Sequence, residues 1–300
     1  MLNHNKNLYF LLLAVVLIWG INWPMNRIGM DYMPALWHSA IRMIVGCGFM
    51  FLLVTIRGQL TLPGKQELPL IFIIGILQLA LFTSCINLGL QHVNPGRSAI
   101  LVYTVPLFAT PIAILFLNEK LNRNKLMGLI LGFLGIMILF SPWDLTWSVE
   151  MLYGHGILLC AAILFAIAIC CTKNMQSSLS PLQLLPWQLL VGAVLALIFA
   201  LIDDPNPTIE WSQPAILAMI YTGILAAGIA YWLITIVGRK LPAITVSLGL
   251  LGVPLTGVIS SHLILDEPIT ASMKIAMLLI FTGLLFVALE GRTKTICSDK

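Results

Sequence analysis

Polar and aromatic side chains occur inside long apolar segments of this chain, where they are costly unless they have a partner or face water. In the first segment Trp19, Asn22, Trp23 and Asn26 follow the i, i+3, i+4, i+7 spacing of one helix face. Aromatic planes beside an amide group can recognise a polar group of a small molecule, so this face is a candidate cavity wall. An interfacial aromatic belt is an equal alternative for Trp23.

Arg42 is the basic residue that lies well inside an apolar segment. An arginine at the centre of a membrane helix costs ~2.5–3.5 kcal/mol on insertion scales. Two interpretations follow. Arg42 lies about six residues from the segment's end, or ~9 Å along a helix, so it could snorkel to the surface. Alternatively, it is a cavity cation that receives a substrate carboxylate.

Further candidates for substrate binding share helix faces in later segments. Aromatic rings with a polar tip can both stack and hydrogen-bond, whereas a serine or threonine often bonds its own helix backbone. The candidates besides Trp19, Asn22 and Arg42 are Gln78, Ser84, Asn87, Tyr103, Tyr231, Trp232 and Thr256.

Two acidic residues and two prolines occupy matching positions and are candidate gating residues. Glu119 and Glu267 stand where equivalent apolar segments stop, and Pro106 and Pro254 interrupt the same segments. A solvated helix end, with Glu119 pairing to a nearby cation, is the plainer alternative for the two glutamates.

The composition requires a membrane protein with many spans. The 300 residues are 59% apolar and 9% charged, whereas soluble domains carry roughly a quarter charged residues. A span needs ~20 apolar residues, and short loops with Pro, Gly or Asn separate the apolar segments. The predicted spans are 9–28, 36–56, 69–89, 97–117, 125–141, 154–172, 182–201, 214–234, 243–263 and 272–289.

The positions of the cations predict the orientation, because cytoplasmic loops are enriched in Lys and Arg. With both termini in the cytoplasm, the outer segments hold Arg27, Arg97 and Lys274. The cytoplasmic segments then hold Lys6, Arg57, Lys65, Lys120, Arg123, Lys125, Lys173, Arg239, Lys240, Arg292, Lys294 and Lys300.

An internal repeat appears at an offset of 148 residues. Val105-Pro106-Leu107 matches Val253-Pro254-Leu255, Glu119 matches Glu267, and Gly135 matches Gly283. The repeats span residues 9–141 and 154–289, with five spans each. An odd number of spans inverts the second copy, and inverted repeats are typical of transporters with a site between the halves.

Several motifs resemble one known family. They are the opening stretch Ala14–Trp23, the stretch Ser98–Leu107, and the two segment ends Leu117-Asn118-Glu119-Lys120-Leu121 and Leu265-Asp266-Glu267-Pro268-Ile269. Together they resemble the EamA-like family of the drug/metabolite transporter superfamily. The resemblance implies ten helices, cytoplasmic termini, a central cavity, and export or exchange of small metabolites, amino acids or drug-like compounds. Small multidrug members of that superfamily carry a proton-coupling glutamate in the first helix, and its absence beside Trp19 puts such coupling in doubt.

Other functions find little support in the sequence. We expect no catalytic residues, metal or cofactor: H-E-x-x-H and G-x-S-x-G motifs are absent, and His38, His92, His155 and His262 lie near span ends, as interfacial residues do. The sequence has no basic stripe of the kind that binds nucleic acid. The expected partners are a small-molecule substrate and the lipid bilayer, in a bacterial inner membrane. Gly128, Gly132 and Gly135 favour close packing within the bundle, or a dimer face, so monomer and homodimer both stay open. Uptake and the flipping of a lipid-linked substrate are alternative functions.

Overall fold

The computed structural model describes residues 2–116, 123–139, 148–173, 175–241 and 243–298, and within these ranges the regular elements are all helical. The first half contains α1 (Leu2–Met30), α2 (Ala35–Ile56), α3 (Leu68–Ile73), η1 (Ile74–Leu81), α4 (Phe82–Leu90), α5 (Pro95–Val102), α6 (Val105–Phe116) and α7 (Arg123–Leu139). The second half contains α8 (Val149–Thr172), α9 (Pro181–Asp203), α10 (Gln213–Met219), η2 (Ile220–Ala230), α11 (Tyr231–Lys240), α12 (Ala243–Leu250), α13 (Gly252–Leu265) and α14 (Ala271–Ser298).

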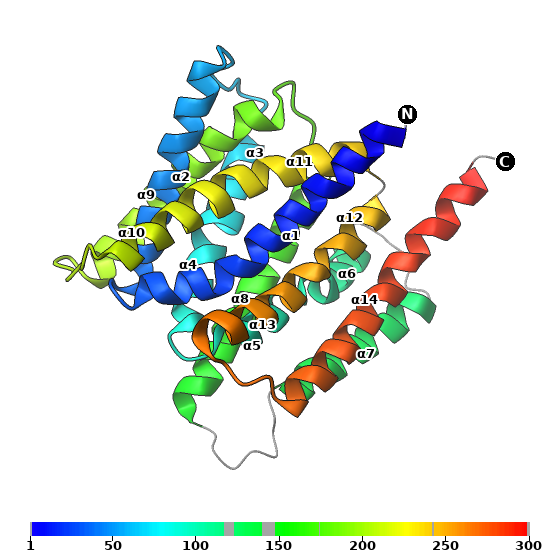
Figure 1. Cartoon of the computed structure of the whole chain (residues 1–300). Helices are drawn as coiled ribbons and strands as arrows, with labels where there is room; N and C mark the ends of the chain where they lie inside the picture. Colours follow the sequence, from blue (N-terminus) through cyan, green and yellow to red (C-terminus); the bar gives the residue numbers. More distant parts are fainter. Residues whose placement is uncertain (1, 117–122, 140–147, 174, 242, 299–300) are drawn as a thin grey trace.

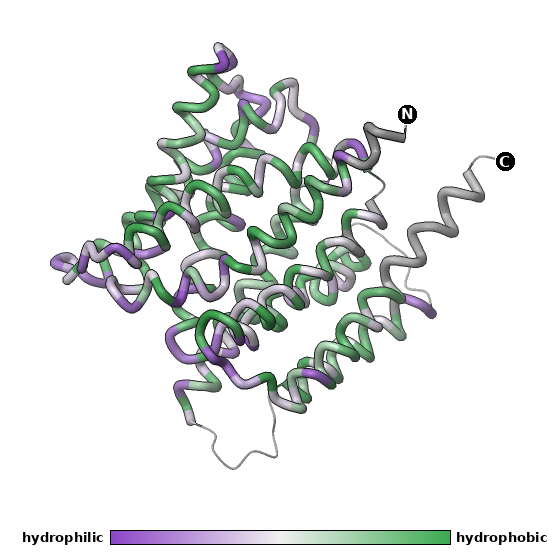
Figure 2. Tube along the Cα trace, in the orientation of Figure 1, coloured by the Kyte–Doolittle hydropathy of each residue, from purple (hydrophilic) through white to green (hydrophobic). Residues whose placement is uncertain are grey.

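Seven continuous helical segments among the described residues are long and apolar enough to cross a membrane. Three shorter apolar helices, Leu126–Leu139, Gly252–Leu265 and Ala271–Phe286, lie where further spans were predicted. Hydrophobic residues follow the helices and hydrophilic ones gather towards their ends (Figure 2). The all-helical membrane class is therefore confirmed, whereas the number of ten spans stays a prediction.

Prolines explain two breaks at matching places. A proline lacks an N–H, and its ring clashes with the carbonyl of residue i−4. Residue i−4 is Val102 for Pro106 and Leu250 for Pro254, and these are the last residues of α5 and α12. The helices restart as α6 and α13, so each predicted span divides into two pieces near its middle.

Two π-helical segments also occupy matching places. The central parts of Leu68–Leu90 and Gln213–Gly238 wind as η1 and η2, which begin one and three residues before Gly75 and Gly223. Both glycines allow a neighbouring helix to approach closely. A Cβ on Gly75 would lie 2.7 Å from Val191 of α9, and one on Gly223 would lie 2.9 Å from the carbonyl oxygen of Arg42 of α2. π-helical turns often occur at functional sites, because they leave backbone carbonyls less regularly bonded.

Helices α7 and α14 pack side by side in an antiparallel pair (Figure 1). A Cβ on Gly135 of α7 would lie 3.0 Å from the carbonyl oxygen of Ala276, while one on Gly283 of α14 would lie 2.6 Å from that of Gly128. The two contacts exchange residues that are 148 apart in sequence. The glycines of this stripe therefore serve close packing inside the bundle, as one of the two sequence interpretations expected.

The bundle is closed by apolar packing between the halves. Fully buried residues of both halves, including Ile100, Leu101, Leu158 and Ile280, form the largest core cluster. Gly89 of α4 and Gly154 of α8 permit a second close crossing, since a Cβ on either would contact the other helix. α1 starts and α14 finishes at the same end of the bundle (Figure 1).

Candidate functional site

The first helix meets the π-helical segment η2 through Trp19. Its indole Nε1 donates a hydrogen bond of 3.2 Å to the carbonyl oxygen of Ala226 in η2. Its ring packs edge-to-face on Tyr231, with the ring centroids 5.3 Å apart. Trp19 therefore lies against the second half of the chain, as a cavity-wall residue would.

Arg42 lies inside the bundle with 4% of its surface exposed, so the snorkelling interpretation is wrong. Its Nη1 donates a hydrogen bond of 3.0 Å to Oδ1 of Asn26, which is 1% exposed. Its Nε is buried and has no hydrogen-bond partner among the described residues. Arg42 is thus a buried cation held by a neutral amide, and a buried charge without a counter-charge is costly.

Tyr231 joins this arrangement to two further helices. Gln78, in η1, lies within hydrogen-bonding reach of the Tyr231 hydroxyl, and Arg42 and Tyr103 lie near that hydroxyl. We call Trp19, Arg42, Gln78, Tyr103 and Tyr231 the central cluster. Its members come from the first, second, third, fourth and eighth predicted spans, and sequence analysis named all of them.

A second buried polar group lies beside Arg42 on α2. His38 has no exposed surface, which corrects its assignment as an interfacial residue; His155 is also buried, at 1% exposed. The Asn87 amide donates to Ser39 Oγ at 2.7 Å and lies 3.1 Å from His38 Nδ1. The sequence had led us to assign His38 to the interface and not to the site, although its position four residues before Arg42 places both on one helix face.

Several buried polar atoms near these groups have no hydrogen-bond partner among the described residues. An unpaired buried donor or acceptor costs about 1–3 kcal/mol, so each marks a place where water or a polar ligand atom would be stabilised. Besides Arg42 Nε they include Asn22 Oδ1, His38 Nε2, Ser84 Oγ, Asn87 Oδ1 and Thr222 Oγ1. Asn22 precedes Asn26 by one helical turn, which places it on the face that carries the Arg42 contact.

Other predicted residues lie apart from the central cluster. Trp232 lines a pocket away from this cluster, and the Arg57 guanidinium lies 4.8 Å from the centroid of its ring. Thr256 Oγ1 donates to the carbonyl oxygen of Gly252 in its own helix, at 2.8 Å. Trp23 is 4% exposed and packs in the core, which excludes the belt interpretation. Glu119 lies outside the described residues.

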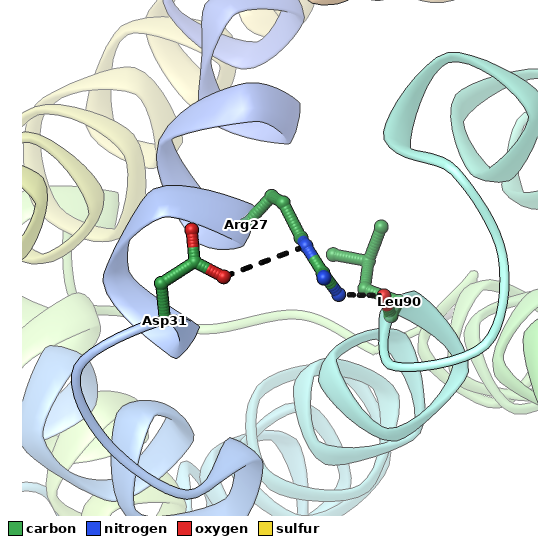
Figure 3. A network of polar contacts seen from close by, with 3 residues as sticks. All are labelled: Arg27, Asp31 and Leu90. Carbon is green, nitrogen blue, oxygen red and sulfur yellow. Dashed lines mark hydrogen bonds and ion pairs between the residues drawn. The ribbon is translucent and has the colours of Figure 1, made fainter. Parts of the chain in front are cut away.

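Glu267 joins the two halves at the end of the bundle opposite the chain termini. Its Oε2 accepts a hydrogen bond of 3.0 Å from the backbone N–H of Gly96, at the start of α5. Burial raises the pKa of Glu267 above its ordinary value, against the opposing effects of the Gly96 N–H and of Arg27. Figure 3 shows Arg27 itself: Nη1 donates to the carbonyl oxygen of Leu90 at 2.9 Å, and Nε lies 3.7 Å from Asp31 Oδ1.

These contacts form a polar layer, which we call the far-end layer, of Arg27, Asp31, Leu90, Gly96 and Glu267. The Arg27–Asp31 pair is partly exposed, with 39% and 54% of the side chains accessible, so it is worth at most about 1 kcal/mol. The Glu267–Gly96 bond is the contact of this layer that crosses between the halves. Across the described residues, no group of three His, Cys, Asp or Glu side chains is placed to hold a metal ion.

Comparison with known proteins identifies relatives over almost the whole chain. The model of the EamA-like transporter family matches twice, at residues 6–141 and 152–289. The Bacillus subtilis (strain 168) protein named "Uncharacterized transporter YoaV" is 30% identical, over 91% of this chain and 94% of its own length. The Escherichia coli (strain K12) protein named "Probable amino-acid metabolite efflux pump" is 28% identical, over 91% of this chain and 92% of its own.

One solved crystal structure has the same fold. It matches with a TM-score of 0.68 at 17% sequence identity and covers 96% of this chain and 98% of its own. At that identity the likeness concerns the fold alone.

Proposed function

Because the chain belongs to the EamA-like transporter family, we propose that it is an alternating-access transporter that exports small carboxylate-bearing metabolites. We place it in the inner membrane of a bacterium, with both termini in the cytoplasm. Its ten helical spans form two inverted five-helix repeats, residues 9–141 and 154–289. Membership of a transporter family also favours transport over intramembrane catalysis.

Reciprocal contacts support the inverted repeat. Gly135 approaches Ala276 while Gly283 approaches Gly128, and the two helices run antiparallel. Two copies related by a two-fold axis in the membrane plane would exchange their contacts in this manner. Each half also contains one proline break and one π-helical segment. The family model matches each half once.

The burial of Arg42 is the observation on which the proposed substrate class depends. The described residues supply it with an amide partner, Asn26, and no carboxylate lies in ion-pair contact with it. A substrate carboxylate would provide the missing charge and could bond the unpaired Nε. The rings of Trp19 and Tyr231 would then contact the apolar body of the substrate. Relatives named as amino-acid metabolite efflux pumps fit that chemistry.

The far-end layer and the two proline breaks support a gated mechanism. The Glu267–Gly96 bond links the halves at one end, so this end must separate when the site opens there. Pro106 divides the predicted span that begins near Gly96, and Pro254 divides the equivalent span that ends near Glu267. Such breaks can act as hinges between the pieces on either side. Glu119, the sequence match of Glu267, is the proposed counterpart at the other end.

Metabolite profiling of cells with and without the protein first identifies candidate substrates. Flux of labelled compounds into proteoliposomes then tests the proposal. Three labelled compounds are compared: an aromatic amino acid, its deaminated acid and its decarboxylated amine. We expect flux of the two carboxylates, and at least a tenfold loss in Arg42→Gln, since hydrogen bonds to charged groups are worth about 1.5–3 kcal/mol. Varying the pH gradient tests proton coupling.

Arg123→Gln is the matched control, because this arginine is exposed at the start of α7. Equal losses in the two variants, or flux of the amine alone, would contradict the carboxylate assignment. Movement of a labelled phospholipid between leaflets, without metabolite flux, would replace export by the flippase alternative.

A further inference from the structure

A pocket separate from the central cluster lies at the end of the bundle where α2 and α11 finish and α9 begins. Its volume is about 540 Å³, and its wall contains Gln59, Ser180, Pro181, Leu182, Gln183, Trp232, Ile236 and Lys240. That volume lies within the range of ligand sites in proteins. Helix α11 contributes Trp232, Ile236 and Lys240, which are spaced at i, i+4 and i+8 and therefore form one stripe.

The stripe changes in chemistry along the helix. Trp232 is nearest the middle of the bundle, Ile236 follows one turn later, and the cation Lys240 is the last residue of α11. Leu182, on the opposite wall, is 6% exposed. Arg57, the residue after α2, adds a second cation above the Trp232 ring. The pocket is thus apolar inside and cationic at its edge.

Polar groups of the pocket wall are already engaged with one another. Ser180 Oγ accepts from the backbone N–H of Gln183, whose side-chain Oε1 accepts from the N–H of Ser180. Gln183 Nε2 donates to the carbonyl oxygen of Gln59 and to Thr61 Oγ1. This wall leaves little capacity to recognise a sugar or a base by directed hydrogen bonds.

Charge and apolar contact therefore remain as the means of recognition. None of the described residues that line the pocket carries a carboxylate. Glu67, at the same end of the bundle, accepts a hydrogen bond from Ser178 at 2.7 Å, and no ion pair occupies Lys240 within the described part of the chain. An anionic amphiphile matches these properties.

We propose that this pocket binds an anionic phospholipid from the adjacent leaflet. The phosphate lies between Arg57 and Lys240, and one acyl chain follows Ile236 and Leu182 towards Trp232. The location favours a lipid over a soluble anion, because the apolar spans end here and basic pockets between helices at the membrane surface suit lipid headgroups. The site is independent of the transported substrate.

Native mass spectrometry of the detergent-purified protein tests the site. The protein is titrated with phosphatidylglycerol, with phosphatidylcholine, and with glycerol 1-phosphate, which has the anionic headgroup without acyl chains. We expect retention of phosphatidylglycerol alone. A cation near a lipid surface is worth about 1 kcal/mol, so Lys240→Gln should weaken this binding about fivefold. Trp232→Ala should weaken it by removing the apolar wall.

Lys65→Gln is the matched control, because Lys65 is an exposed lysine at the same end of the bundle and is not part of the pocket wall. Equal binding by Lys240→Gln and Lys65→Gln would overturn the proposed headgroup position. Competition by glycerol 1-phosphate at the same concentrations would show a soluble-anion site instead. Equal retention of phosphatidylcholine would show that charge has no part in recognition. In Trp232→Ala, unchanged binding would overturn the acyl-chain placement.

Discussion

Arg42 and Tyr231 define the chemistry of the centre at the scale of single residues. The Arg42 guanidinium bonds the Asn26 amide and lies near the Tyr231 phenol. Its positive charge therefore lies between α1, α2 and α11. A buried cation in such surroundings retains a strong attraction for anions, because little water screens it. Under the proposed function, the site would therefore select substrates by charge and then by fit against aromatic rings.

Tyr231→Phe should separate the role of the hydroxyl from that of the ring. The variant keeps the ring contact with Trp19 but loses the hydroxyl beside Gln78 and Arg42. We expect roughly two- to tenfold weaker substrate binding with unchanged membrane abundance, since a neutral hydrogen bond is worth about 0.5–1.5 kcal/mol. Binding is measured by substrate-induced quenching of tryptophan fluorescence. Wild-type affinity in Tyr231→Phe would remove the hydroxyl from the site.

Glu267 should make the opening of the far end depend on pH. Burial raises its pKa in the closed arrangement, so the protonated carboxyl favours that arrangement. Opening to water would return the pKa towards about 4.3. Closure is therefore favoured fully below the ordinary pKa, and this preference is lost as the pH rises through the raised value.

Labelling of a cysteine placed at Thr270, in a cysteine-free background, measures this effect from pH 4 to 8. Labelling is divided at each pH by that of the same protein after denaturation, because the thiolate fraction itself rises with pH. We expect this ratio to rise with pH in the wild-type background and to be low and nearly constant in Glu267→Gln, which resembles the protonated form. Asp266→Asn is the control, since Asp266 is exposed and Asn tolerates its left-handed backbone, φ 54°. A pH-dependent response that persists in Glu267→Gln would contradict the assignment.

At the scale of elements, the helices were largely predictable and their interruptions were not. The length of the apolar segments predicted the helices. Pro106 and Pro254 coincide with two breaks, whereas Pro24, Pro111 and Pro186 lie inside continuous helices. The π-helical turns were not predictable, since they accompany the close approach of other helices at Gly75 and Gly223. Adjacent side chains on a helix point about 100° apart. Tyr231 therefore lies in the central cluster, whereas its neighbour Trp232, also a predicted site residue, lines the separate pocket.

Gly135→Leu and Gly283→Leu should destabilise the protein by similar amounts. Each leucine would collide with the backbone of the partner helix, and overpacking of this kind costs about 1–3 kcal/mol. Thermal unfolding in detergent should show lower midpoints for both. Gly156→Leu is the control, because a Cβ there meets nothing within 4 Å. A loss confined to one of the two positions would contradict the reciprocal packing.

At the scale of the whole molecule, hydrogen bonds join the two halves at both ends. At the far end Glu267 accepts from Gly96, and beside the pocket at the other end Gln183 donates to Gln59 and Thr61. In the proposed transport cycle, inverted repeats exchange their conformations, so such contacts would separate at one end at a time. The repeat offset was visible in the sequence, whereas the contacts at each end depend on side-chain placement that sequence patterns do not contain.

The proposed alternating access requires the two ends of the bundle to open in turn. Double electron–electron resonance tests this requirement by measuring distances between pairs of spin labels at exposed positions. The pairs are Leu60–Gly238, at the end of the chain termini, and Asp31–Ala271, at the far end. We expect opposite changes: on substrate addition one distance lengthens as the other shortens. Two distances that stay fixed during transport, or that lengthen together as in a channel, would contradict it.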